Sequence, residues 1–456
     1  MMKKLFTIMT CLLVALFALG ACAGPNPGDD SSGSGEAKVT LKVWIQTANQ
    51  PQFFNWAAQR YNQLHPNVTI NYIPQNTANL GTSLDASLAG SNAPDITATW
   101  GGLIVPRLIT GDRILQINDV VTEEVEARLN DSAMINKIDS GTGDWYALPF
   151  SGFASPVIFY NADYFTQNGL QEPETYEDLV EIADKIRANG DETMVSGFGD
   201  WPLSHFMQAM HARTMTEEDF DGLIGVNTER NPFESQTEPG TPVAGLTEGF
   251  QLLKRYNTDG IFASNLTGYN SDTAKSYFTQ GRAVMYAGPS SDYLSMASSA
   301  NFTIKAFVLP DAPSDLKPAS GGTDTMISGI FSDVFVINAR TEYAEECKEF
   351  LRFLISDEAQ AKLLETFLFP VVTGVTTDSM PEAYRVAFEN VLGEIYTGIQ
   401  EGCTGFYQSY SVGQMDGRLK DLGQSVLAEA AGTDEASAAA ALNLLNFYQN
   451  SGVIQK

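Results

Sequence analysis

The feature that most limits the possible fold is an alternation of strand and helix patterns that begins at Val39. Alternating and β-branched residues predict strands at Val39–Ile45 and Val68–Tyr72, and a short strand at Asp95–Thr99 that ends at Trp100. Between them, Phe53–Leu64 has apolar residues at helical spacing, and Leu80, Leu84 and Leu88 recur every four residues. Strands that alternate with helices predict a mainly parallel sheet with helical crossovers.

Both patterns continue along the chain. Further strands are predicted at Trp145–Phe150, Val157–Asn161, Ser196–Gly199, Ala283–Ala287, Thr303–Leu309 and Val334–Ile337. Helices are predicted at Tyr176–Ala188, Leu203–Ala212, Thr247–Tyr256 and Tyr343–Leu354. Thr175 and Asp178 are spaced as a capping box. The polar segment Thr214–Pro242 predicts a loop-rich insertion, and the pattern after Ser356 is almost wholly helical.

Length and charge restrict the possible functions. A chain of 456 residues, 43% of them apolar and 11% aromatic, is long enough for two or three folded domains. The formal charge of −28 argues against nucleic acid as a partner, because its phosphates would be repelled. It also argues against electrostatic adhesion to anionic lipid.

The start of the chain has the layout of a secretory signal peptide. Lys3 and Lys4 precede an apolar run, Leu5–Leu19, that is too short to span a bilayer. The run ends in Leu19-Gly-Ala-Cys22, which resembles a bacterial lipobox. We therefore expect residues 1–21 to be removed and Cys22 to carry lipid. Residues 22–38, rich in Gly, Ser and Asp, predict a flexible tether to the outer face of the cell membrane.

Two cysteines remain within the predicted folded body. Cys347 shares a helical face with Ala344, Leu351 and Leu354, which favours a buried thiol. Cys403 lies in Glu-Gly-Cys-Thr-Gly, which is typical of a loop. The sequence does not decide whether the two cysteines form a disulfide.

The sequence gives little support for catalysis. It contains no His-Glu-x-x-His zinc motif, no Gly-x-Ser-x-Gly elbow and no phosphate-binding Gly-x-x-x-x-Gly-Lys loop. Its three histidines are His65, His205 and His211, and the last two lie six residues apart on one predicted helix, facing different ways. No metal or cofactor is expected. Because 55 acidic residues leave a carboxylate pair possible, a lipid-anchored glycan hydrolase stays an alternative.

Several motifs, in this order and behind a lipobox, resemble the extracellular solute-binding proteins of carbohydrate ABC transporters, the group that includes maltose-binding protein. They are Val43-Trp-Ile45, Ala93-Pro-Asp-Ile96 with Trp100, Trp145–Phe150, Ile158-Phe-Tyr-Asn161, Phe278–Met285 with Gly288-Pro289, and Cys347–Leu354 with Ser356-Asp-Glu358. The resemblance implies an α/β fold of the two-lobed periplasmic-binding-protein type II, with three interlobe crossings and a helical C-terminal region.

The resemblance also implies domain borders and a function. One lobe would comprise residues 39–151 and 310–356, and the other residues 152–309 and 357–456. The crossings would fall near Ser151–Phe153, Lys305–Asp311 and Ser356–Asp357. A monomeric, non-enzymatic protein would capture a mono- or oligosaccharide between the lobes and deliver it to an ABC permease. A Gram-positive-type host is expected, because the anchor matters most in a cell with one membrane.

Sugar binding needs aromatic faces and hydrogen-bonding groups, and the sequence offers both near strand ends. The aromatic candidates are Trp100, Trp201, Tyr293, Tyr407 and Tyr410. The resemblance implies Tyr293, Tyr407 and Tyr410, and it supports Trp201, which also lies in a turn before a predicted helix. Trp44 and Trp56 are predicted to be core residues, and Trp145 is left undecided. The other candidates are Gln46, Asn49, Gln50, Asn76, Phe150, Ser151, Ser290, Asp292, Gly329 and Phe331.

One departure from the family pattern concerns Gly288-Pro289, which tryptophan often follows in the family. Here Ser290, Ser291, Asp292 and Tyr293 follow instead. Either Tyr293 replaces the missing ring, or Ser290 and Asp292 bind ligand by hydrogen bonds. The departure argues against a long maltodextrin-type ligand. A receptor that feeds a sensor, or a protein for a polyamine, iron chelate or phosphodiester, stays an alternative.

Overall fold

The computed structural model describes the folded part of the chain from Ala37 onward. The described residues are 37–46, 51–75, 84–100, 104–130, 133–134, 137, 140, 142–216, 242–317, 329–400, 415–429 and 435–451. Lys38–Lys456 forms one compact unit. Among the described helices, none is both long enough and apolar enough to cross a membrane. Cys22 and the predicted leader and tether lie outside this part, apart from Ala37 and Lys38.

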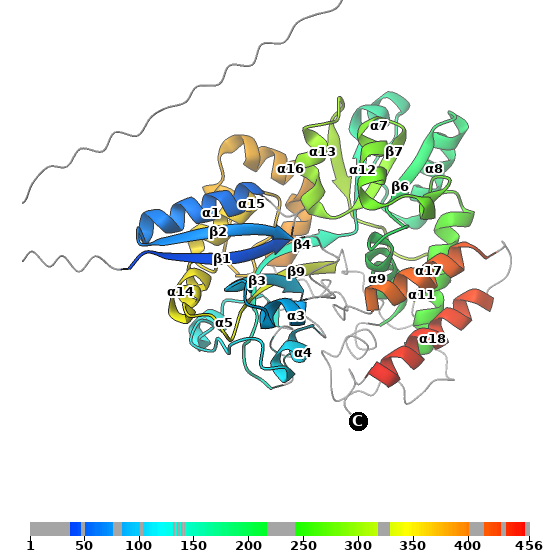
Figure 1. Ribbon diagram of the computed structural model, residues 1–456. Coiled ribbons are helices and arrows are strands. Elements are labelled where there is room, and N and C mark those ends of the chain that lie inside the picture. The colour runs from blue at the N-terminus through cyan, green and yellow to red at the C-terminus, as the bar shows by residue number, and fades with distance from the viewer. Residues whose placement is uncertain are drawn as a thin grey trace, which may run out of the picture. The chain divides into compact units, whose positions relative to one another are not determined.

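The first sheet has five strands in the order β2-β1-β3-β9-β4 (Figure 1). Their bounds are β1 Val39–Gln46, β2 Val68–Gln75, β3 Ile96–Trp100, β4 Leu148–Ser155 and β9 Gly329–Ile337. Helices α1 (Pro51–Leu64) and α3 (Leu84–Ala89) lie between β1, β2 and β3 in the chain. The predicted order of strands and helices in this part is therefore confirmed.

The predicted mainly parallel arrangement is only partly correct. Strand β1 pairs in parallel with β2 and β3, as helical crossovers require. Strand β9, however, is antiparallel to both β3 and β4. It follows β8 of the second sheet along the chain, so its direction is not set by a crossover helix within the first sheet.

The second sheet has four strands in the order β6-β7-β5-β8. Their bounds are β5 Val157–Asn161, β6 Glu192–Ser196, β7 Ala283–Gly288 and β8 Ile304–Phe307. The strand predicted at Ser196–Gly199 is wrong in position, because β6 ends where that prediction begins. Likewise, β4 begins at Leu148 instead of Trp145 and runs on to Ser155, beyond the predicted end at Phe150.

Helices account for most of the remaining described chain. Their bounds are α4 Ile104–Thr110, α5 Glu123–Glu126, α7 Ala162–Asn168, α8 Tyr176–Ala188, α9 Pro202–Thr214, α11 Pro242–Thr258, α12 Ser271–Thr279, α13 Tyr293–Ala297, α14 Ala344–Leu354, α15 Asp357–Leu364, α16 Glu382–Gln400, α17 Met415–Leu427 and α18 Glu435–Ser451. Short 3-10 turns are η1 Leu266–Gly268, η2 Ser290–Asp292 and η3 Thr377–Ser379. Helix α9 packs against α11 and α17, as Figure 1 shows.

Local patterns explain several of these helices. The capping box at the start of α8 is confirmed: Thr175 Oγ1 accepts a hydrogen bond from the Asp178 N–H at 3.1 Å. In return, Asp178 Oδ2 accepts one from the Thr175 N–H at 2.9 Å. Helix α14 buries one face, including Cys347, which is a free buried thiol. Cys403 and most of the predicted insertion Thr214–Pro242 lie outside the described residues.

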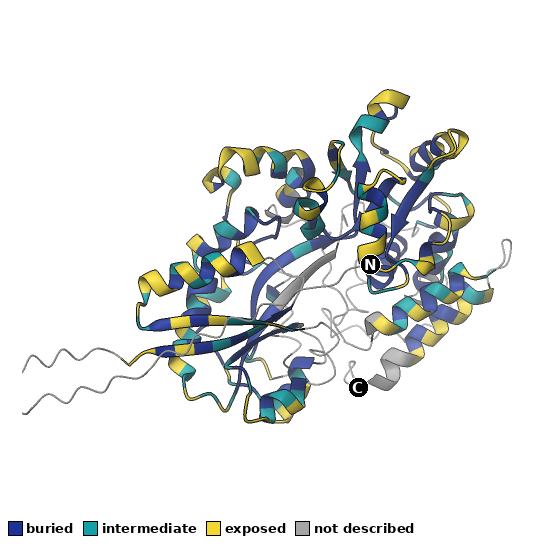
Figure 2. Cartoon of the chain, turned by 45° about the horizontal axis from the view of Figure 1, so that its top comes forward, coloured by how far each residue is buried: buried dark blue, intermediate teal, exposed yellow. Residues whose placement is uncertain are grey.

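The core lies between the sheets and their helices. In Figure 2 the central strands are mostly buried, whereas helices expose one side. Phe150 of β4 belongs to this core, with ring-centroid distances of 4.4 Å to Phe335 and 5.8 Å to Phe54. Aromatic packing of this kind stabilises the first sheet from within.

The chain passes from the first sheet to the second at Pro156, since β4 ends at Ser155 and β5 begins at Val157. A second segment lies along β4 there, because Gly152 and Phe369 exchange backbone hydrogen bonds of 2.8 and 2.7 Å. The buried Gln360 amide donates to the carbonyls of Phe150 and Leu354. The bonds to Gly152 and Phe150 give hydrogen-bonding partners to backbone groups of the edge strand β4, which would otherwise be unpaired.

Candidate functional site

Strand β4 and its neighbours bring several predicted site residues to one region of the first sheet. On β9, Asp333 pairs with Trp100 of β3 on one side and with Ser151 of β4 on the other. Phe331 and Gly329 lie further along β9, also opposite β4. The backbone therefore places Trp100, Ser151, Gly329 and Phe331 on three adjacent strands.

Other predicted residues cannot be placed. The side chains of Trp100 and Phe331 lie outside the described part of the structure, and Gly329 is described by its backbone alone. The whole residues Asn49, Gln50, Asn76, Tyr407 and Tyr410 also lie outside it. Gln46 is described: it ends β1, is buried, and lies opposite Gln75 in the register of β1 with β2.

A second set of groups meets β4 from α9. Trp201, half-buried, directly precedes this helix, and its ring centroid lies 4.7 Å from that of His205. His205 Nδ1 is 3.1 Å from the Oγ of Ser155, the last residue of β4. Burial lowers the pKa of His205 to about 3, so its imidazole is neutral at physiological pH.

Phe153 is a site candidate that sequence reasoning missed. It shares a face of β4 with Ser151 and Ser155, because side chains two residues apart point the same way. Its ring is half-buried and lies 6.3 Å from that of His205. The sequence signal was available in principle, since Phe153 falls in the segment where the first crossing was predicted.

Ser290 has a structural role in the described residues. It is fully buried, and its Oγ accepts a hydrogen bond from the Ala154 N–H at 3.1 Å. The same hydroxyl donates to the carbonyl of Phe367 at 3.5 Å. Ser290 therefore joins η2, which follows β7, to β4 and to the segment that pairs with β4.

Asp292 is also engaged within the protein. Its carboxylate accepts hydrogen bonds from Lys275 Nζ at 2.9 Å and from the Tyr286 hydroxyl at 2.7 Å. Burial, reinforced by Asp292, raises the pKa of Tyr286 well above its usual range. Gly288 is required beside this pair, because a Cβ there would lie 2.4 Å from the Tyr286 ring. The network fixes the turn that carries Ser290.

Tyr293 and Phe150 pack against other aromatic side chains. The Tyr293 ring is stacked on Phe367, with centroids 4.5 Å apart, and burial raises its pKa. Tyr293 is half-buried and keeps some surface, whereas Phe150 is only 2% exposed. The Phe150 ring therefore has almost no surface to offer a ligand.

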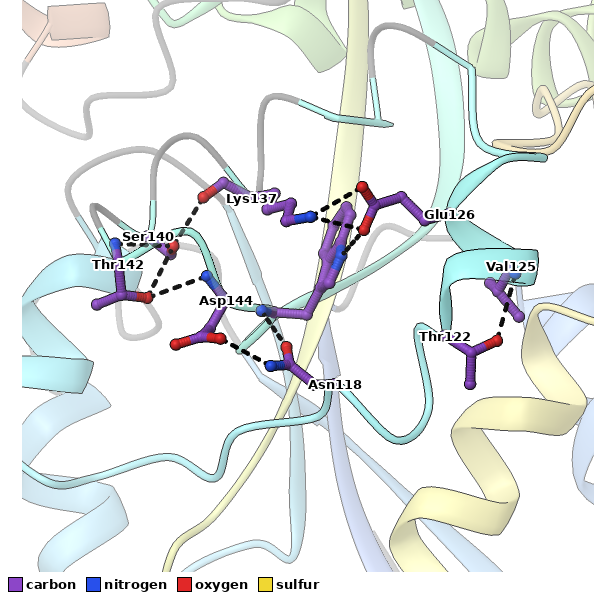
Figure 3. Close-up of polar contacts among 9 residues, drawn as sticks. Asn118, Thr122, Val125, Glu126, Lys137, Ser140, Thr142 and Asp144 are labelled. Carbon is purple, nitrogen blue, oxygen red and sulfur yellow. Dashed lines mark hydrogen bonds and ion pairs between the residues drawn. The ribbon is translucent and has the colours of Figure 1, made fainter.

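Trp145 is buried and lies three residues before the start of β4. Its indole Nε1 donates to Glu126 at 2.8 Å, and the same carboxylate pairs with Lys137 at 2.7 Å (Figure 3). Its backbone N–H donates to Asn118, whose amide in turn donates to Asp144. The bonds from Lys137 and Trp145 hold the pKa of Glu126 below its usual range.

The described side chains around β4 have the chemistry of a contact surface for an apolar ligand face. The described side chains Ser151, Phe153, Ser155, Trp201 and His205 are uncharged at neutral pH and combine hydroxyl groups with aromatic rings. Over the described part of the chain, no group of three or more His, Cys, Asp or Glu could hold a metal ion. Of these five side chains, Phe153 and Trp201 keep some exposed surface, and such rings can contact the apolar face of a neutral molecule.

Comparison with known proteins gives a family match and several curated relatives. A family model described as bacterial extracellular solute-binding protein matches residues 56–387. The sn-glycerol-3-phosphate-binding periplasmic protein UgpB of Escherichia coli strain K12 is 26% identical over 209 residues, which is 42% of this chain and 47% of that protein. The match thus spans about half the length of the first curated relatives.

Solved structures agree on the fold. A chitin oligosaccharide binding protein superposes with a TM-score of 0.69 at 17% identity, covering 90% of this chain and 98% of its own. A solute-binding protein named RafE, in complex with raffinose, gives a TM-score of 0.67 at 15% identity, covering 90% and 99%. The predicted two-lobed α/β fold is therefore confirmed.

Proposed function

Because the chain belongs to the bacterial extracellular solute-binding protein family, we propose that it captures a sugar or oligosaccharide and delivers it to an ABC permease. Proteins of this family bind solutes and are not enzymes, which speaks against the hydrolase alternative. Closure of two lobes around the ligand is the working step of the proposal, and no covalent chemistry is needed.

The observation that carries the sugar assignment is the presence of two aromatic rings, Phe153 and Trp201, that keep some exposed surface near the end of β4, where the hydroxyls of Ser151 and Ser155 are buried. Phe153 and Trp201 are both half-buried, so each keeps part of its ring surface available. Flat C–H patches of sugars stack on such rings, while neighbouring polar groups satisfy the sugar hydroxyls. Structural neighbours named for chitin oligosaccharide and raffinose support the same ligand class.

An anionic ligand is the second candidate, because relatives are named for sn-glycerol-3-phosphate. The start of α9 beside Trp201 would favour an anion through the helix dipole. Asp200, however, already occupies this position: its Oδ1 accepts a hydrogen bond from the Trp201 N–H at 2.8 Å. Its Oδ2 also accepts one from the Ser271 hydroxyl at 3.3 Å. A carboxylate at this position would repel a phosphate.

The test is a calorimetric titration of purified protein with xylo-, chito- and maltooligosaccharides, raffinose and sn-glycerol 3-phosphate. Saturable binding of a neutral saccharide is expected. Trp201→Ala should weaken it about tenfold or more. Trp56→Ala is the matched control, because Trp56 lies on α1 and packs on Phe353 of α14, so its replacement should change stability only. Binding of the phosphate alone would overturn the sugar assignment.

The membrane anchor is a further part of the proposal. Lipid on Cys22 would keep the binding protein near its permease at high effective concentration. Cys22→Ala should release the protein from the membrane fraction and abolish incorporation of labelled fatty acid. Cys11→Ala, within the predicted leader, should do neither. Uptake of labelled ligand is then measured in cells with and without this protein. Uptake that requires the protein supports transport, whereas unchanged uptake favours the alternative in which the protein feeds a sensor.

A further inference from the structure

His205 lies near two half-buried aromatic side chains that come from different parts of the chain. Phe153 belongs to β4, and its ring centroid is 6.3 Å from that of His205 with an interplanar angle of 30°. Trp201 precedes α9, and its ring is 4.7 Å from His205 at 59°. His205 itself is only 5% exposed. The buried imidazole thus lies close to two rings that each keep some exposed surface.

A hydrogen-bonding contact fixes this imidazole to the strand that leads from one sheet to the other. His205 Nδ1 is 3.1 Å from Ser155 Oγ, and Ser155 is itself buried at the end of β4. Trp201 precedes His205 by four residues, the spacing at which side chains on a helix are neighbours. A chain of contacts therefore runs from Ser155 through His205 to Trp201.

We propose that His205 is a positioning residue, which holds Phe153 and Trp201 as one aromatic surface for ligand contact. This inference rests on the proposed function, because it names the residues that would contact the ligand. It adds Phe153 to the predicted contact residues and assigns His205 a role through Trp201 instead of a direct bond to ligand. Movement of β4 at Ser155 would also be transmitted to Trp201.

The physical reason is that a half-buried indole has several staggered rotamers open to it. Packing against a fixed imidazole restricts them before ligand arrives, so less conformational entropy is lost on binding. Without the ring of His205, Trp201 would be free to turn away from Phe153. Affinity would then fall even though no group that contacts ligand is removed.

His211 provides a matched control. It lies on the same helix, is fully buried, and burial lowers its pKa to about 3 as well. Its ring packs against Phe250 of α11 at 5.0 Å, a contact outside the Phe153, His205 and Trp201 group. If His205 only stabilised the fold, replacing either histidine would lower stability, and neither replacement would change ligand binding in a way that depends on Trp201.

The first experiment needs no ligand. Fluorescence of His205→Asn and His211→Asn is measured with and without Trp201→Phe, and the difference isolates the emission of Trp201. His205→Asn should shift this emission to longer wavelength and increase its quenching by acrylamide, whereas His211→Asn should not. An unchanged Trp201 emission in folded His205→Asn would overturn the proposal, whatever the ligand is. His205→Phe, which keeps a ring, should restore much of the signal.

The second experiment uses whichever member of the ligand panel binds the wild-type protein. His205→Asn should weaken binding about tenfold in the wild-type background and have little effect when Trp201 is already alanine. An equal loss in both backgrounds would show that His205 does not act through Trp201. If only sn-glycerol 3-phosphate binds, the sugar assignment fails, yet the same cycle still decides the role of His205.

Discussion

At the scale of single residues, burial and hydrogen bonding decide which predicted site residues remain available to a ligand. Ser290 and Asp292 were predicted as polar ligand contacts, but both are engaged by protein groups in the described structure. Their proposed role changes accordingly, from ligand contact to support of β4. Trp201 keeps its proposed role, because it is half-buried beside the uncharged groups of β4.

Replacement of Ser290 by alanine should destabilise the protein. The Ala154 N–H would lose its partner within a buried region, which costs about 1–3 kcal/mol in the free energy of unfolding. Urea denaturation followed by circular dichroism measures the change. Ser291→Ala, in the same turn and without a hydrogen bond from its side chain, should alter stability by less than about 0.5 kcal/mol. Equal effects of the two variants would contradict the assignment.

Glu126→Ala should also destabilise the protein. It removes the group that accepts the hydrogen bond of the buried Trp145 Nε1–H, and it removes the ion-pair partner of Lys137. We expect a loss of about 1–3 kcal/mol, measured by urea denaturation. Glu124→Ala, on the exposed side of the same short helix α5, is the control and should be nearly neutral. A stability equal to that of the wild type in Glu126→Ala would show that the network contributes nothing.

At the scale of elements, the close packing of α9 against α11 depends on glycine. At Gly249 of α11, an added Cβ would lie 2.2 Å from the Cδ2 of His211 on α9. At Gly245, one turn earlier, it would lie 2.5 Å from the Cγ of Met215. Two small residues four apart therefore allow the helices to approach closely, although the sequence pattern alone did not indicate this contact.

Gly249→Ala is expected to cost about 1–3 kcal/mol, because overpacking forces α9 and α11 apart. Gly417→Ala is the control: it lies in α17 and has nothing within 4 Å of the added Cβ. Removing a glycine from a helix there should stabilise the protein by about 0.5–1 kcal/mol. Thermal and urea unfolding of both variants measures the contrast. A neutral Gly249→Ala would show that the helices can move apart without loss.

At the scale of the whole molecule, two buried neutral histidines make stability depend on pH. His205 and His211 have a folded pKa of about 3, below the unfolded value of 6.5. The unfolded chain therefore binds protons that the folded protein does not, once the pH falls below the unfolded value. The full contribution of the two histidines to stability is therefore present above their unfolded pKa. It is lost as the pH falls from that value toward their folded pKa.

The predicted slope is about 1.4 kcal/mol per pH unit for each histidine below the unfolded pKa. Urea denaturation between about pH 4.5 and about pH 8 measures it. Because other acidic groups also titrate in this range, the informative quantity is the difference between the wild type and His211→Phe. In His211→Phe, the free energy of unfolding should change with pH by about 1.4 kcal/mol per pH unit less than in the wild type. An identical pH dependence in both proteins would contradict the burial of a neutral His211.

The sequence by itself determined the features that depend on neighbouring residues. The alternation from β1 to β3, the capping box of α8 and the buried face of α14 with Cys347 all follow from patterns within one or two elements. The motifs also indicated the family, and hence the two-lobed fold. Boundaries such as those of β4 and β6 were less accurate, because strand ends depend on pairing partners that local patterns do not reveal.

Only the tertiary structure decided which distant residues meet. The antiparallel β9, the bond from Ala154 to Ser290 across 136 positions and the packing of Phe153 on His205 join segments that no local pattern connects. A hydroxyl or carboxylate in a turn has the same sequence signature whether it binds a ligand or a backbone amide. The choice depends on which groups the fold brings within hydrogen-bonding distance, and that is a property of the whole chain.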